Sequence, residues 1–288
     1  MAREPTRDLI RQPAVSGTFY PADPTILSHD IALYLEQATP AEIRGEITGL
    51  IAPHAGYMYS GAVAGWGYKS LSQRTYDTVI VVAPSHKSYF EGAALQEKGG
   101  YRTPLGMTKV DEEFASILLK ETSYVQSNFV AHQGEHSLEV QLPFLQTVLR
   151  EFRIVPLIMG TQDVDLCEAL ASALFRVIQG TGKRCLVVGS TDLSHYYPYS
   201  HALELDGHVA RNLDAFDIRG LLRDLAGDKC EACGAGPIIT TMMVSQKMGA
   251  NRGKVLKYAN SGDVSGDKSS VVGYISAVFY KMDKGHGE

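Results

Sequence analysis

Four short apolar runs are the feature of the sequence that most limits how this chain can fold. They are EITGLIAP, YDTVIVVAP, RIVPLIMG and KRCLVVGS, at residues 46–53, 76–84, 153–160 and 183–190. Each run is apolar on both faces of an extended chain and is rich in β-branched residues. This pattern is typical of strands that are buried on both sides in a parallel sheet.

Segments with helical spacing lie around these runs, at residues 111–122, 137–152, 163–180 and 201–225. Strands that alternate with helices predict an α/β fold in which a mostly parallel central sheet is flanked by helices. No linker or repeat divides the sequence, so we expect a single domain over residues 1–288. The last apolar run, residues 268–281, predicts a strand at an edge or in an antiparallel position.

Composition restricts the partners and the location of the protein. The formal net charge of −5 provides no basic field for nucleic acid or for anionic membranes. No apolar run approaches the roughly 20 residues that span a bilayer, and the N-terminus lacks the apolar segment of a secretion signal. We therefore expect a cytoplasmic protein without nucleic-acid partners and without membrane insertion. Its four cysteines are too few for a disulfide framework and are expected to be reduced.

Three histidines follow the predicted strands by a few residues. His54 comes after the first run, His86 after the second and His195 after the fourth. Loops at the carboxyl ends of parallel strands converge over a ligand crevice, so the three rings can meet there. A single histidine after a strand is more often a hydrogen-bonded loop residue. Pro53 and Pro84 end two of the strands rigidly, which suits side chains that hold a ligand in place.

A cysteine pair in KCEACGAGP, residues 229–237, offers a soft ligand for a metal ion. Cys233 precedes a Gly-Ala-Gly-Pro turn, and its thiolate together with two imidazoles would form a face for Fe(II), Cu or Zn. Glu231 is the alternative anionic ligand. Cys230 and Cys233 would equally fit a redox pair or inert buried thiols, and the sequence lacks the partners of a structural zinc site.

Two further pairs join an acidic residue to a histidine. Asp192 and His195 are three residues apart, which would place them on one face of a helical turn. An aspartate that accepts from one ring nitrogen would orient His195 and leave the other nitrogen free for proton transfer. Glu135 and His136 are predicted at the start of a helix, either because an acidic residue stabilises that end or because both lie beside the site.

Seven segments occur in the order that is seen in one protein family. They are RQPAVSGTFYPAD, LIAPHAGYMYSG, VAPSHKSYF, EHSLEVQLPFL, STDLSHYYPY, EACGAGP and NSGDVSGDKSSVVGYISAVF. Together they span nearly the whole chain, which resembles Memo-like proteins, also called AmmeMemoRadiSam system protein B. The resemblance implies a fold similar to that of class III extradiol dioxygenases, enzymes that use non-heme Fe(II) to open catechol-like rings.

The resemblance also implies roles for particular residues. By position, it makes His54, His86 and Cys233 the metal ligands and His195 the acid/base. Fe(II) is the metal expected first, copper second and zinc third. Because an oxidisable thiolate replaces the carboxylate of the dioxygenases, metal-dependent redox chemistry on an unknown substrate is favoured over ring cleavage.

Two other functions remain open. The same crevice would serve a non-catalytic module that binds a peptide or a small molecule, with a pocket lined by loop tyrosines. These are Tyr57, Tyr59, Tyr89, Tyr196, Tyr197 and Tyr199. A metal ion with an open position would also support hydrolysis, because it activates water. The sequence leaves the substrate and the oligomeric state open.

Overall fold

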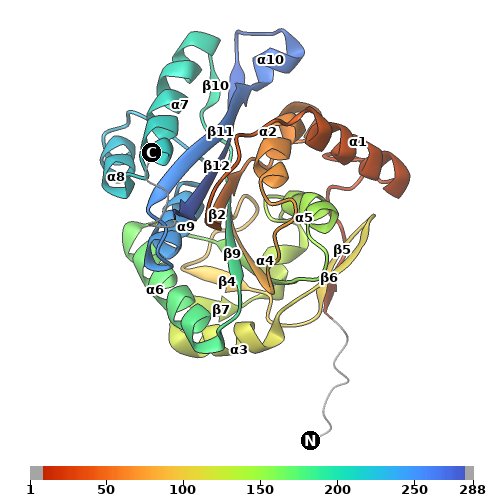
Figure 1. Ribbon diagram of the computed structural model, residues 1–288, viewed down its shortest axis with the longest axis vertical. Coiled ribbons are helices and arrows are strands. Elements are labelled where there is room, and N and C mark those ends of the chain that lie inside the picture. The colour runs from red at the N-terminus through yellow and green to blue at the C-terminus, as the bar shows by residue number, and fades with distance from the viewer. Residues whose placement is uncertain (1–8, 283–288) are drawn as a thin grey trace, which may run out of the picture.

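Nine strands pair in one sheet within residues 9–282, the part of the chain that the computed structural model describes (Figure 1). Their order is β10-β12-β2-β9-β3-β8-β4-β7, and β11 also pairs with β12. A second sheet of three strands has the order β1-β5-β6. Residues 1–8, which belong to the N-terminus where we expect no secretion signal, lie outside the described residues.

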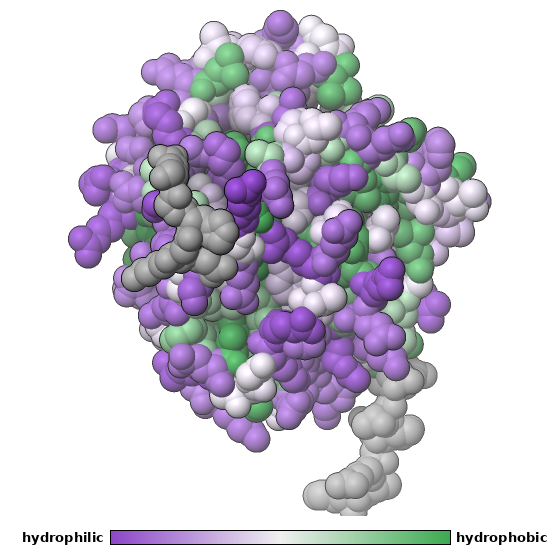
Figure 2. All heavy atoms as spheres, in the orientation of Figure 1, coloured by the Kyte–Doolittle hydropathy of each residue, from purple (hydrophilic) through white to green (hydrophobic). Residues whose placement is uncertain are grey.

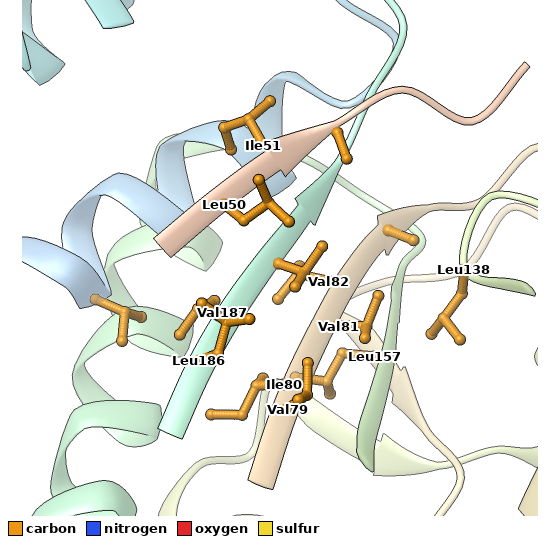
Figure 3. Close-up of a cluster of buried hydrophobic side chains, with 14 of the residues drawn as sticks. Leu50, Ile51, Val79, Ile80, Val81, Val82, Leu138, Leu157, Leu186 and Val187 are labelled. Atoms are coloured by element: carbon orange, nitrogen blue, oxygen red, sulfur yellow. The ribbon is translucent and has the colours of Figure 1, made fainter. Parts of the chain in front are cut away.

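The four predicted strands are confirmed and form the centre of the large sheet. They are β2 (Glu46–Ala52), β9 (Cys185–Ser190), β3 (Thr78–Pro84) and β8 (Arg153–Met159), adjacent in that order and parallel. Side chains such as Leu50, Val81 and Val187 fill the interior around these strands (Figure 3). Figure 2 shows that the surface facing the viewer is mainly hydrophilic, with hydrophobic residues in small separate areas. The predicted α/β class is therefore confirmed.

The outer strands run largely antiparallel, so the sheet as a whole is mixed. β12 (Val271–Lys281) pairs antiparallel with β2 and with β11 (Arg252–Asn260). The predicted tail strand is thus confirmed as antiparallel, but it is an interior strand and not an edge. The other strands are β4 (Ala93–Leu95), β7 (Val125–Ser127), β10 (His195–Tyr197), β1 (Ile10–Arg11), β5 (Gly100–Thr103) and β6 (Gly106–Lys109).

Helices cover both faces of the large sheet (Figure 1). In β2, Leu50 faces Gly67 of α2, whereas Gly49 faces Ser245 of α9. Because successive residues of a strand point to opposite faces, α2 and α9 lie on opposite sides of the sheet. The helices are α1 (Pro24–Gln37), α2 (Tyr57–Lys69), α3 (Glu112–Glu121), α4 (Phe129–Gln133), α5 (Leu142–Val148), α6 (Val164–Thr181), α7 (Tyr199–Asp214), α8 (Ile218–Ala226), α9 (Ala235–Lys247) and α10 (Ser261–Ser265). Each helix within residues 9–282 is too short or too polar to cross a membrane.

Two of the predicted helices are divided in the structure. Residues 137–152 form the short 3-10 helix η1 (Glu139–Gln141) followed by α5, so the helix start predicted at Glu135 and His136 is wrong and these residues lie in a turn before η1. Residues 201–225 are split between α7 and α8. Phe216 has a positive φ of 53°, and the side chain of Asp217 accepts from Gly220 N to begin α8.

Gly49→Ala is expected to destabilise the fold by about 1–3 kcal/mol. A Cβ at this position would lie 2.9 Å from the Phe279 ring and would overlap Ser245 Oγ, so both side chains would have to shift. Gly180→Ala in α6 is the matched control, because no neighbour approaches a Cβ there and alanine favours the helix by up to about 1 kcal/mol. Urea unfolding measures both variants. Equal stability of the two would contradict the close packing of β2 against α9.

Candidate metal centre

The carboxyl ends of β2 and β3, on either side of β9, bring two of the predicted histidines together. His54 and His86 each stand two residues beyond the end of their strand. Their ring centroids are 5.1 Å apart and the rings are inclined at 76°. His54 is buried, whereas the side chain of His86 is 31% exposed. One wall of this pair is therefore closed by the protein and the other faces solvent.

A third imidazole, that of His136, completes the cluster. Its ring centroid lies 5.5 Å from that of His54 and 4.8 Å from that of His86. One nitrogen of each of the three rings lies within 4.8 Å of the other two, a spacing at which one metal ion could bind all three. The turn that carries His136 is anchored by Leu138, which is fully buried beside the central strands (Figure 3). Because this turn follows no strand, the position of His136 in the sequence did not indicate the cluster; its adjacent Glu135 was the available signal.

A chain of hydrogen bonds fixes the ring of His54. Gln141 accepts at Oε1 from Tyr68 (2.6 Å) and donates through its nitrogen to Ser190 Oγ (2.8 Å). Ser190 donates its own proton to Ser137 O at 2.7 Å. The Ser190 hydroxyl can therefore only accept from His54 Nδ1, which lies 2.8 Å away. His54 Nε2 therefore carries no proton of its own.

One buried carboxylate orients the other two rings. Glu135 Oε1 accepts from His86 Nδ1 at 3.1 Å, and His136 Nδ1 lies 3.2 Å from the same oxygen. The backbone N–H groups of His86, His136 and Ser137 also donate to this carboxylate. Burial would raise the pKa of Glu135, but the hydrogen bonds, those from His86 first, hold the pKa well below its usual value. An ionised carboxylate only accepts, so the ring of His86 carries its proton on Nδ1 and leaves Nε2 without one.

The electrostatics of the cluster favour neutral rings. Burial lowers the pKa of His54 well below its usual value, and the nearby His86 and His136 lower it further. Burial also lowers the pKa of His136. A neutral imidazole offers one unprotonated nitrogen, and a metal cation bound within this cluster would satisfy such nitrogens.

Cys233 lies against the cluster at His54. Its Sγ is 3.2 Å from His54 Nε2, and it accepts from Asp192 N at 3.2 Å. Burial and the nearby charge of Asp192 raise the pKa of the thiol to about 12, so Cys233 keeps its proton unless a cation is present. Gln162 donates to Cys233 O at 2.9 Å and holds the loop in place. The four cysteines all lie within residues 9–282 and are free thiols there.

Asp192 and His195 lie at the same end of the sheet, but their predicted pairing on a helical turn is wrong. His195 begins β10, and its Nδ1 donates to Leu193 O at 2.7 Å, so the backbone fixes the tautomer and leaves Nε2 free. Asp192 instead accepts from His54 N at 2.8 Å. Burial raises the pKa of Asp192 to about 6. Glu231, the alternative ligand, accepts from His195 N at 2.9 Å.

The tyrosines predicted to line a pocket have different environments. Tyr57 is buried in α2 and donates to Val140 O. Half-buried are Tyr59, Tyr197 and Tyr199. Tyr89 and Tyr196 are 81% and 76% exposed, and the ring of Tyr196 lies 5.7 Å from that of His195. Exposed aromatic surface is therefore present beside His195.

Comparisons with known proteins relate the whole chain to one family. A family model described as Memo-like protein matches residues 11–278. A MEMO1 family protein of Methanopyrus kandleri is 40% identical over 278 residues, which cover 93% of this chain and 98% of the relative. A MEMO1 family protein of Methanobrevibacter smithii is 37% identical over 281 residues, covering 94% and 100%. The crystal structure of an uncharacterized protein from Escherichia coli K12 aligns with a TM-score of 0.52 over 80% of this chain and 99% of its own, at 13% identity, which supports the fold alone.

Proposed function

The chain belongs to the Memo-like family, and from that premise we propose that it is a metal-dependent oxidoreductase. In this proposal His54, His86 and Cys233 hold one metal ion, and His136 offers a further nitrogen to the same space. One observation carries the proposal: one nitrogen of each of the three imidazoles lies within 4.8 Å of the other two, and His54 and His86 hold their ring proton on Nδ1 against an acceptor.

Charge supports Cys233 as the anionic ligand. A divalent ion among neutral imidazoles alone would keep its full charge in a partly buried site, which is unfavourable. The nearby carboxylates already accept hydrogen bonds, Glu135 from His86 and Asp192 from His54 N. A thiolate formed at Cys233 as metal displaces the thiol proton would therefore supply the missing negative charge.

The donor set also bears on which metal is bound. Imidazole and thiolate ligands suit iron, copper and zinc, and we propose Fe(II) first and copper second because zinc has no redox chemistry. When bound, iron or copper supplies one-electron chemistry at the site. The protein's own contribution is His195, whose free Nε2 would accept a proton from a substrate hydroxyl while Nδ1 stays bonded to Leu193 O. The substrate is a small molecule in this proposal.

Anaerobic purification followed by elemental analysis tests the proposal directly. We expect near-stoichiometric iron or copper, and oxygen uptake in the presence of ascorbate that disappears when the metal is removed by a chelator. Protein that stays metal-free after reconstitution with Fe(II), Cu and Zn would refute it. Stoichiometric zinc without oxygen uptake would refute the redox role and favour metal-dependent hydrolysis.

A second candidate function is a binding module for a peptide or a metabolite. The exposed aromatic side chains of Tyr89 and Tyr196 favour it, because both follow a histidine of the site by a few residues and neither is buried in the core. Aromatic rings in such positions provide contact area to ligands. A ligand that binds equally well to the metal-free and the metal-loaded protein would support this function over catalysis.

A further inference from the structure

A fully buried ion pair links the N-terminal segment to the turn behind the cluster. Arg11 in β1 and Glu139 in η1 form a hydrogen-bonded pair, and both side chains are 0% exposed. Transfer of two charges out of water is unfavourable, and a well-packed apolar pair often stabilises a fold as well or better. Stability alone therefore gives no reason for charges at these two positions.

Arg11 lies over the ring of Tyr101, and its other two hydrogen bonds reach α4 and the turn that follows it. Its Nε donates to His132 O at 3.0 Å, and its Nη2 donates to Glu135 O at 2.6 Å. The carboxylate of Glu135 accepts from the ring of His86 and from the backbone N of His136, whose Nδ1 lies 3.2 Å away. The planar guanidinium thus ties the backbone of Glu135, the backbone of His132 and the carboxylate of Glu139 together, with one hydrogen bond to each.

The other contacts of Glu139 reach back to the N-terminal segment. Its carboxylate accepts from Ala14 N at 2.8 Å, from Val15 N at 3.2 Å and from the hydroxyl of Tyr20. These bonds hold residues 14–20 against η1. Within that segment, Phe19 places its ring 4.8 Å from the ring of His136. The backbone O of Phe19 also accepts from Tyr57 N at 2.7 Å, at the start of α2.

We propose that Arg11 and Glu139 are positioning residues for the candidate metal centre. Arg11 holds the backbone of Glu135, and Glu139 holds the segment that places Phe19 against His136. Together they fix the rings of His86 and His136 without contacting a bound ion. The expected effect on metal binding rests on the proposed function. The effect on ring orientation does not, because that orientation is a property of the metal-free protein.

The variant Arg11→Met/Glu139→Gln tests the inference in the full-length protein. It removes both charges together, so neither is left buried alone. We expect its affinity for Co²⁺ to fall about 10- to 100-fold, as is typical when a residue that supports the metal ligands is substituted. We also expect the ¹⁵N NMR signals of the His86 and His136 rings in metal-free protein to show mixed tautomers. The control is Lys183→Met/Asp111→Asn, which also removes both charges of a pair, but at the starts of β3 and β9, the ends of these strands opposite to the cluster.

Unchanged ring signals and unchanged Co²⁺ affinity in the double variant would overturn the inference. If that variant does not fold, Arg11→Lys replaces it: the charge remains but the planar guanidinium is lost, and we expect the same mixed tautomers with at least about a 10-fold loss of Co²⁺ affinity. Wild-type affinity and ring signals in Arg11→Lys would overturn the inference equally. Absence of Co²⁺ binding in the wild type would refute the proposed function, and the ring signals would then decide the positioning role by themselves.

Discussion

His54→Ala is expected to lower the affinity of the protein for Co²⁺ or Fe(II) by more than about 100-fold. Changes to residues behind a ligand typically weaken metal binding by about 10- to 100-fold, and removal of the ligand itself should exceed this. His54 belongs to both possible sets of metal ligands. It clusters with His86 and His136, and it also faces Cys233. It is also held rigidly, through Ser190 at Nδ1 and through Asp192 at its backbone N.

Anaerobic Co²⁺ titration followed by optical absorption measures this loss. His208→Ala is the matched control, because His208 also faces a carboxylate, that of Asp224 on α8, but belongs to α7 outside the cluster. Two further variants distinguish the possible ligand sets: Cys233→Ser removes the thiolate, and His136→Ala removes the third imidazole. Ligation by the thiolate predicts a sulfur-to-cobalt charge-transfer band that persists in His136→Ala and is absent from Cys233→Ser. Wild-type affinity in His54→Ala would rule out this centre.

Glu135→Gln should have the second largest effect, because one carboxylate serves two rings. We expect Co²⁺ affinity to fall about 10- to 100-fold and the free energy of unfolding to fall by about 1–3 kcal/mol. In the wild type, the carboxylate accepts hydrogen bonds from N–H groups of His86, His136 and Ser137. In the variant, the NH₂ group of glutamine would face some of these donors. Either the rings turn or a buried donor loses its partner. Asp224→Asn at the half-buried His208 pair is the control and should change neither quantity measurably.

The pH dependence of stability gives a further test of Glu135. Its pKa is held well below the usual value in the folded protein, chiefly by His86, although burial opposes this. A depressed folded-state pKa stabilises the fold fully above the unfolded-state pKa of about 4.3, and this stabilisation is lost as the pH falls below it. The difference in unfolding free energy between wild type and Glu135→Gln should therefore narrow below about pH 4. A difference that stays constant down to acid unfolding would contradict the role of the carboxylate.

The strands of the central sheet could be predicted because their signal is local. Each of the four runs is apolar on both faces over a length that fits one buried strand, and Pro53 and Gly160 are the last residues of two of them, immediately after the strands end. The helices were less predictable. Helical spacing continues through residues 201–225, but the backbone turns at Phe216 and a new helix begins after Asp217. Among the outer strands, an antiparallel direction was predicted only for the tail strand, because apolar periodicity does not reveal the direction of the others.

By itself the sequence determined that His54 and His86 stand at the ends of two buried strands, since strand formation and strand termination depend on residues within a few positions. Only the tertiary structure decided that His136 joins them, and that Glu135 accepts from Nδ1 of His86 and leaves Nε2 of that ring without a proton. These outcomes depend on contacts between segments far apart along the chain, among them the bond from Arg11 to the turn before η1. They depend as well on burial, because a hydrogen bond fixes the tautomer of a ring firmly only where water cannot replace the partner.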